Sequence, residues 1–215
     1  MPEEQPRRLS GIHHVTAIAS DPQRNAEFYV GLLGLRLVKR SVNQDDPGTY
    51  HLFYADGLGS PGTDLTFFPY MNAARGVKGN GQAVAVAFAI PETALEFWSA
   101  RLTGAGVGAT RERGAFGEEV VAFSDHDGLR LQLVAGAGTA DRTPWSPWFD
   151  GSVPVEMAIR GIHSVTVQEA GGDPTAGFLT EVLGFRLLAE GDGRLRFATG
   201  PGSSGALLDL LPRPG

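Results

Sequence analysis

The chain alternates between strand-like and helix-like hydrophobic patterns from about residue 9 onward. In the first segment His14, Thr16 and Ile18 share one side of an extended chain, as in a half-buried strand. Asp21 can cap a following helix, and Pro22 suits its first position. An apolar stripe at helical spacing then consists of Ala26, Tyr29, Val30 and Leu33. The opening segment therefore predicts a strand followed by a helix.

Turn signals and three further strands complete this first unit. Gly34 suits the left-handed residue that ends a helix. Strand-like runs follow at 35–39, 50–55 and 64–68, separated by turns rich in Asp, Pro and Gly. The order strand, helix and three strands defines a βαβββ module.

The module recurs later in the chain. Gly11-Ile12-His13-His14-Val15-Thr16 returns 150 positions later as Gly161-Ile162-His163-Ser164-Val165-Thr166, and residues 33–37 return with the same shift as 183–187. A fainter copy lies between the two, with strands at 83–90, 118–124 and 129–134 and a helix at 91–102.

These repeats predict an α+β fold in which βαβββ modules form cup-shaped mixed sheets. We place three modules, at residues 9–70, 80–135 and 158–212, and a linker at 136–157. We expect the second and third modules to pair with each other.

Composition narrows the function classes. The net charge of −6, with scattered Lys and Arg, argues against nucleic acids and anionic membranes as partners. The polar N-terminus has no apolar signal core, which predicts a cytoplasmic protein. The absence of cysteine excludes disulfides, thiolate metal sites and cysteine nucleophiles. Any metal must be held by His, Asp, Glu or backbone oxygen.

Paired βαβββ modules resemble the vicinal oxygen chelate superfamily, which includes glyoxalases, bleomycin-resistance proteins and extradiol dioxygenases. Within it the chain is most similar to the four-module dioxygenases that cleave hydroquinone rings. The strings that carry this resemblance are 9–16, Val38-Lys39-Arg40, Tyr50-His51-Leu52-Phe53-Tyr54-Ala55-Asp56, Gly59-Ser60-Pro61-Gly62-Thr63 and 156–163. The resemblance implies oxidative cleavage of a dihydroxylated aromatic substrate of the hydroquinone or catechol class.

The resemblance also implies a site for iron(II), with manganese(II) as the alternative, held by two histidines and one carboxylate. Its first-module ligand falls on His14. The other two ligands of the family lie in a fourth module, for which these residues have no counterpart. We therefore expect an incomplete metal site, and a chain that is truncated, inactive or metal-free as it stands.

The candidate site residues also have ordinary structural interpretations. His14 could equally be a hydrogen-bonded core histidine, and only the resemblance favours the ligand role. His13 and Thr16 are candidates for contact with substrate or with a metal ligand, against ordinary strand roles. At the position of His14 the other modules have Ala83 and Ser164, and their closing strands have Gln132 and Asp209 where a ligand Glu would lie.

The sequence also allows two other functions and predicts a homodimer. The first rival is a glyoxalase-type, metal-dependent lyase or isomerase, which needs more His and Glu ligands than the modules supply. The second is a protein that binds a small molecule without catalysis. The unpaired first module should expose a sheet edge that needs a cover. We therefore predict a homodimer through that module.

Overall fold

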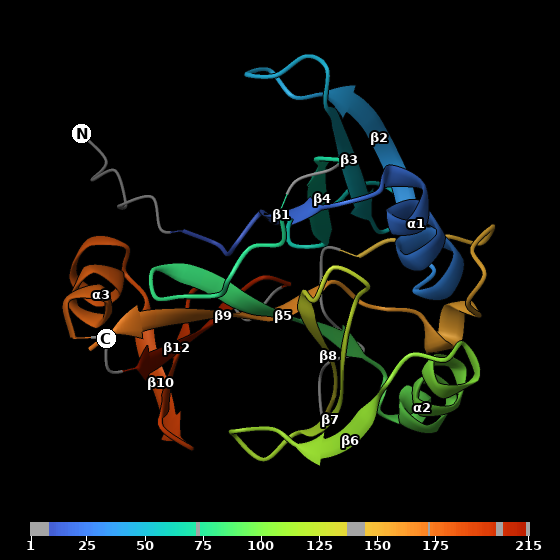
Figure 1. Cartoon of the computed structure of the whole chain (residues 1–215). Helices are drawn as coiled ribbons and strands as arrows, with labels where there is room; N and C mark the ends of the chain where they lie inside the picture. The colour runs from blue at the N-terminus through green and yellow to red at the C-terminus, as the bar shows by residue number, and fades with distance from the viewer. Residues whose placement is uncertain (1–8, 72–73, 137–144, 172, 201–203, 214–215) are drawn as a thin grey trace, which may run out of the picture.

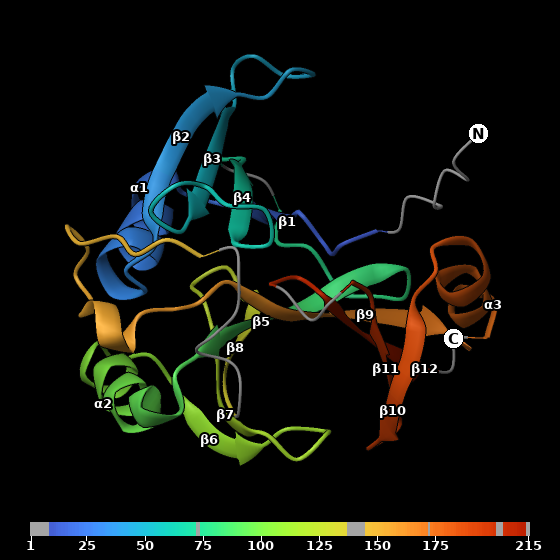
Figure 2. The same ribbon diagram turned by 180° about the vertical axis from the view of Figure 1, so that it is seen from behind.

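The computed structural model describes residues 9–71, 74–136, 145–171, 173–200 and 204–213, and within them the chain forms two mixed sheets. The first sheet has the strand order β1 (His14–Ala19), β4 (Asp64–Pro69), β3 (Tyr50–Ala55) and β2 (Arg36–Val42). The second has the order β10 (Arg186–Gly191), β11 (Arg194–Ala198), β12 (Leu207–Arg213), β9 (Ile162–Ala170), β5 (Gln82–Ile90), β8 (Arg130–Ala135), β7 (Glu119–Ser124) and β6 (Thr110–Arg113). The first sheet stands above the curved second sheet in Figures 1 and 2.

Short helices pack against the two sheets. They are α1 (Pro22–Ala26) with η1 (Glu27–Leu32), η2 (Glu92–Ala94) with α2 (Leu95–Gly104), η3 (Val155–Met157), and α3 (Asp173–Gly177) with η4 (Phe178–Val182). None of the helices in these described ranges is long and apolar enough to cross a membrane.

The predicted α+β fold of three βαβββ modules is confirmed by the strand pairing. In each module the first strand runs parallel to the last: β1 with β4, β5 with β8, and β9 with β12. Modules 2 and 3 share one sheet because β5 pairs antiparallel with β9. The hydrophobic pattern did not locate β6, whose residues Thr110–Arg113 lack an apolar alternation.

The first helix begins as its sequence predicts but ends differently. The Asp21 carboxylate accepts hydrogen bonds from the backbone N–H groups of Gln23 and Arg24, at 2.8 and 3.0 Å. The last turn widens into a π-helical segment, where the Leu33 N–H donates to the Phe28 carbonyl five residues back. Module 3 repeats this wide turn through Leu183 and Phe178. The sequence pattern predicted a plain α-helix because Tyr29 and Leu33 are buried either way.

Module 1 is fixed to module 2 by a buried hydrogen bond and by helix-end contacts. The Tyr29 hydroxyl donates to the Asp125 carboxylate at 2.9 Å, with the tyrosine fully buried. Burial, reinforced by the charge of Asp125, raises the pKa of Tyr29 well above its usual range. The Arg101 guanidinium of α2 donates to the carbonyls of Leu32 and Gly31, at 2.8 and 2.9 Å. These contacts fix the orientation of the first sheet.

A junction of four backbone hydrogen bonds joins module 1 to module 3, and we call it the glycine junction. Ile12 N–H donates to Gly205 O, Gly205 N–H to Ile162 O, and Ile162 N–H to Gly62 O, each at 2.8 Å. The Gly62 N–H closes the chain on the carbonyl of His13 at 2.7 Å. A Cβ at Gly62 would lie only 2.5 Å from the Ser204 carbonyl oxygen, and one at Gly205 would overlap the Ile12 carbonyl oxygen. The repeated Gly-Ile-His strings thus lie where two backbones meet.

We predict that Gly205→Ala destabilises the protein more than Gly184→Ala. Both glycines have positive φ, +75° and +70°, but a Cβ at Gly184 meets no atom within 4 Å. The control should cost about 1 kcal/mol for the backbone conformation alone. Gly205→Ala should cost about 3 kcal/mol or more because it also breaks the glycine junction. Equal unfolding free energies in urea titrations would contradict this role.

Candidate active site on the open face of the first sheet

The first sheet has one covered and one open face. Tyr29 of η1 packs on the covered face, where its ring centroid lies 5.3 Å from that of Tyr54 and 4.6 Å from that of Phe67. The opposite side, which we call the open face, carries His14, Thr16 and Ile18 of β1, His51 and Phe53 of β3, and Thr66 and Phe68 of β4. The predicted alternation of β1 therefore places His14 and Thr16 together, and both are exposed.

His13 and His14 lie in contact although neighbours in a strand point to opposite faces. β1 begins at His14, so His13 precedes the strand and does not follow its alternation. Their Nδ1 atoms are 3.3 Å apart and the rings meet edge to face, with centroids 5.4 Å apart. This contact leaves Nε2 of His14 as the ring nitrogen available to a ligand on the open face.

Three polar side chains form a line across the open face. The Thr16 and Thr66 hydroxyl oxygens are 2.9 Å apart, and Nε2 of His51 lies 3.1 Å from Thr66 Oγ1. The His51 ring is held between Phe53 and Phe68, with centroid distances of 4.0 and 4.1 Å. Burial lowers the pKa of His51, and the nearby charges of His14 and Lys39 lower it further.

Asp64 is an unusual buried carboxylate beside this line. It lies opposite His14 in the parallel β1–β4 register and is only 7 % exposed. Its Oδ1 has no hydrogen-bond partner among the described residues. Burial raises the pKa of Asp64, while the charges of His13 and His14 oppose that rise. Asp64 stands at the start of a strand, where a charged residue is ordinarily expected at the surface, so its burial was not predictable from the sequence.

These residues fit a metal ion only in part. Nε2 of His14 is suitable as one ligand, and Oδ1 of Asp64 has no hydrogen-bond partner among the described residues. Across the described ranges, however, His, Asp and Glu do not assemble into any group of three or more that could hold a metal. Iron(II) and manganese(II) sites need more donors than one histidine provides.

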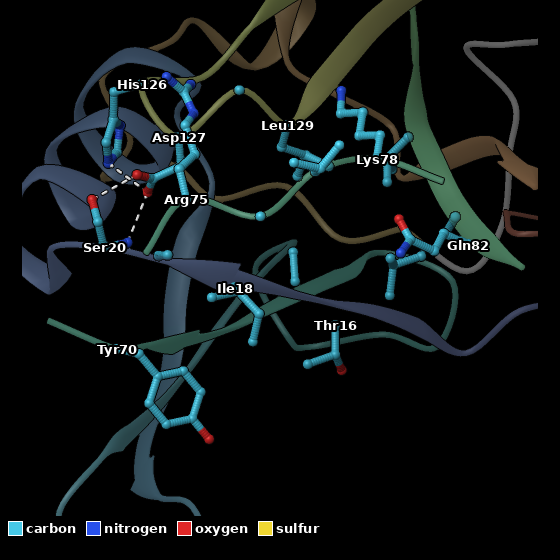
Figure 3. Close-up of a pocket in the computed structure, with 18 of the residues that line it drawn as sticks. Thr16, Ile18, Ser20, Tyr70, Arg75, Lys78, Gln82, His126, Asp127 and Leu129 are labelled. Atoms are coloured by element: carbon cyan, nitrogen blue, oxygen red, sulfur yellow. Dashed lines mark hydrogen bonds and ion pairs between the residues drawn. The ribbon is translucent and has the colours of Figure 1, made fainter. Parts of the chain in front are cut away.

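A groove of about 700 Å³ runs along the free edge of β1. Figure 3 shows Thr16 and Ile18 on one side of β1 and Leu129 and Lys78 on the other. One end is closed by Asp127, whose carboxylate accepts hydrogen bonds from the backbone N–H and the hydroxyl of Ser20, at 2.9 and 2.6 Å. Within the described chain β1 pairs only with β4, so its other edge lies open to this groove.

The corresponding face of the second sheet is filled by an internal cation. In the strand registers Thr16 lies opposite Thr66, and in module 3 Thr166 lies opposite Asp209. The Arg196 guanidinium donates to both oxygens of Asp209, at 2.6 and 2.8 Å, and also binds the Glu118 carboxylate. Burial opposes its charge, but the two carboxylates outweigh burial and raise the pKa of Arg196. Asp209, a candidate metal ligand by sequence, therefore forms an ion pair with Arg196.

The same registers correct one assignment made from sequence. Gln132 of the closing strand lies opposite Ala87, so the position of His14 in module 2 is Ala85 and not Ala83. Both residues are alanines, so module 2 has no histidine at this position in either alignment.

The fold and the exposed histidine on an open sheet face define a glyoxalase-like class of protein. Residues 11–133 match the model of the Glyoxalase/Bleomycin resistance protein/Dioxygenase superfamily, and the chain belongs to that superfamily. The resemblance found in the sequence is thereby confirmed.

Several named proteins are similar to nearly the whole chain. The chain is 40% identical over 209 residues to the "Putative ring-cleaving dioxygenase MhqO" of Bacillus subtilis, covering 97% of this chain and 65% of that protein. It is 31% identical over 218 residues to the chlorohydroquinone/hydroquinone 1,2-dioxygenase of Sphingobium indicum, covering 98% and 67%. The crystal structure of a "putative dioxygenase" from Bacillus subtilis superimposes on this chain with a TM-score of 0.86 at 37% sequence identity. The superposition covers 97% of this chain and 65% of the other. The chain thus spans about two thirds of the length of these relatives.

We predict that Arg196→Met is strongly destabilising. It leaves Asp209, which is 4 % exposed, without its partner, at a cost of about 3 kcal/mol or more. The double variant Arg196→Met/Asp209→Leu should recover most of that stability, because Asp209 is no longer buried without a partner, whereas Glu118 keeps 18 % side-chain exposure to solvent. Denaturant unfolding measures all three proteins. A double variant no more stable than the single one would refute this explanation.

Proposed function

We propose that the chain carries part of the active site of a ring-cleaving dioxygenase for dihydroxylated aromatics of the hydroquinone or catechol class. The observation that carries this proposal is the placement of His14 and Thr16 side by side on the exposed open face. The names of the relatives support the reaction class. The small aromatic substrate and the oxygen-dependent reaction are transferred from them as proposals. A cytoplasmic location is proposed as well.

Each site residue has a proposed role in this reaction. His14 provides one ligand of iron(II), or of manganese(II), through Nε2. Such a metal, when bound, would hold the diol and dioxygen at adjacent positions and relay electrons from the diol to dioxygen. His13 contacts His14 through Nδ1 and so fixes the orientation of that ring. Thr16 presents a hydroxyl to the substrate.

We predict that His14→Ala abolishes iron-dependent oxygen uptake with hydroquinone and reduces the iron bound per chain. The matched control is Ser164→Ala, the same position in module 3, where the face is filled by Arg196 and no metal is expected. Oxygen-electrode traces and metal analysis of both variants test the proposal. Uptake that survives in His14→Ala would exclude the ligand role.

One observation favours a second candidate function, a protein that binds a small aromatic compound without cleaving it. In the described residues no group of three or more potential ligands surrounds His14. Calorimetry with hydroquinone in the presence of a chelator separates the two functions. Binding that needs no metal, together with no oxygen uptake after iron is added, would favour the binding protein.

The open edge of β1 supports a further proposal, that the chain forms a homodimer through module 1. Unpaired strand edges in native proteins are usually covered. Light scattering after size exclusion should give twice the chain mass of 22.7 kDa. Ile18→Lys, which places a charge on the exposed side of β1, should shift the protein to monomer. A monomeric natural chain at high concentration would exclude this assembly.

A further inference from the structure

We propose that Thr66 and His51 are positioning residues that set the hydroxyl of Thr16 to accept a hydrogen bond from a ring hydroxyl on the open face. This inference rests on the proposed function, because it takes the ligand to be a hydroxylated aromatic ring. It concerns two residues on the central strands of the sheet, β3 and β4, and neither of them is a proposed metal ligand.

Thr66 is the central member of a line of three hydrogen-bonding side chains. Thr66 is fully buried and its hydroxyl lies 2.9 Å from Thr16 Oγ1 and 3.1 Å from His51 Nε2. A hydroxyl has one proton to donate, so Thr66 donates to one neighbour and accepts from the other. A neutral imidazole with its proton on Nδ1 can only accept at Nε2. In the proposed arrangement the His51 proton is on Nδ1, so Thr66 donates to His51, Thr16 donates to Thr66, and the exposed oxygen of Thr16 is left to accept.

The surroundings of His51 favour the neutral form of its ring. Its ring lies between Phe53 and Phe68, which provide no counter-charge. The charged or titratable groups that act on it are His14 of β1 and Lys39 of β2, and both disfavour an added positive charge. Lys39 itself lies over the Phe53 ring, with Nζ 5.6 Å from the ring centroid. An acidic group that would hold His51 protonated is not among these neighbours.

The rest of the open face is suited to the carbon skeleton of an aromatic ring. Ile18 is 56 % exposed, and Phe53 and Phe68 are half-buried. Apolar contact with these side chains is the same for any small ring, whether or not it is hydroxylated. The line from Thr16 to His51 therefore provides the discrimination, because a methylated oxygen cannot donate to Thr16.

The test compares two ligands on two conservative variants. Thr66→Val keeps the shape of the side chain and removes its hydroxyl, whereas Thr66→Ser keeps the hydroxyl. Hydroquinone and 1,4-dimethoxybenzene are titrated by calorimetry into the full chain, without metal. Loss of one oriented hydrogen bond should weaken hydroquinone binding to Thr66→Val by about five- to tenfold. Thr66→Ser should stay within about twofold of the natural protein, and dimethoxybenzene should bind all three proteins equally.

His51→Phe extends the test to the end of the line. It should reduce the preference for hydroquinone as Thr66→Val does, while leaving dimethoxybenzene binding unchanged. A general folding defect would weaken both ligands together, and that result would overturn the proposal. So would equal hydroquinone affinity in the natural protein and Thr66→Val, or no binding of either ligand to the natural protein.

Oxygen uptake is measured separately on the natural, iron-loaded chain. Selective loss of hydroquinone binding in Thr66→Val, with no oxygen uptake in the natural chain, supports the positioning pair and refutes the dioxygenase. If the natural chain takes up oxygen but the variants bind hydroquinone as selectively as the natural protein does, only the positioning role of Thr66 and His51 is refuted. The two proposals thus fail in different measurements.

Discussion

The glycine junction determines where the candidate site lies. Its hydrogen bonds run from Ile12 through Gly205 and Ile162 to Gly62, and the last one holds the carbonyl of His13. Because backbone groups buried in this way need partners, each segment fixes the position of the next. The histidine pair therefore begins directly at a point where module 3 meets module 1. A side chain at Gly62 or Gly205 would separate the two modules and move His14 with them.

A second set of contacts orients the sheet that carries His14. Tyr29 binds Asp125 within the core, and Ser20 binds Asp127 at the end of β1. Both acceptors lie in one turn of module 2, so the helix and the first strand of module 1 are attached to the same short segment. The open face is thus presented by a sheet held at both ends of β1. Such rigidity is what a ligand site built on strands requires.

The sequence predicted the repeating architecture well because strand alternation and helix spacing are local signals. Gly-Ile-His and Leu-Gly-x-Arg-Leu recur at fixed spacing, and these strings mark the start of a strand and the end of a helix in both copies. The wide helical turn was not predictable from this pattern, since one extra residue in a turn leaves the buried stripe intact. Strand β6 escaped because three of its four residues are charged.

The sequence predicted the proximity of site residues only where they lie on the same strand. His14 and Thr16 share a face by simple alternation, and the structure places them together. Asp64, His51 and Thr66 join them from two other strands, so their proximity depends on strand order and register, which the sequence does not specify. The partnership of Arg196 with Asp209 has the same origin, since the two residues are adjacent only across β11 and β12.

That partnership has a consequence for how the protein depends on its surroundings. A guanidinium is made with the chain and cannot be lost by dilution, oxidation or chelation, whereas a bound ion must be acquired from the cell. The larger sheet is therefore complete at the moment of synthesis, whatever the supply of transition metals.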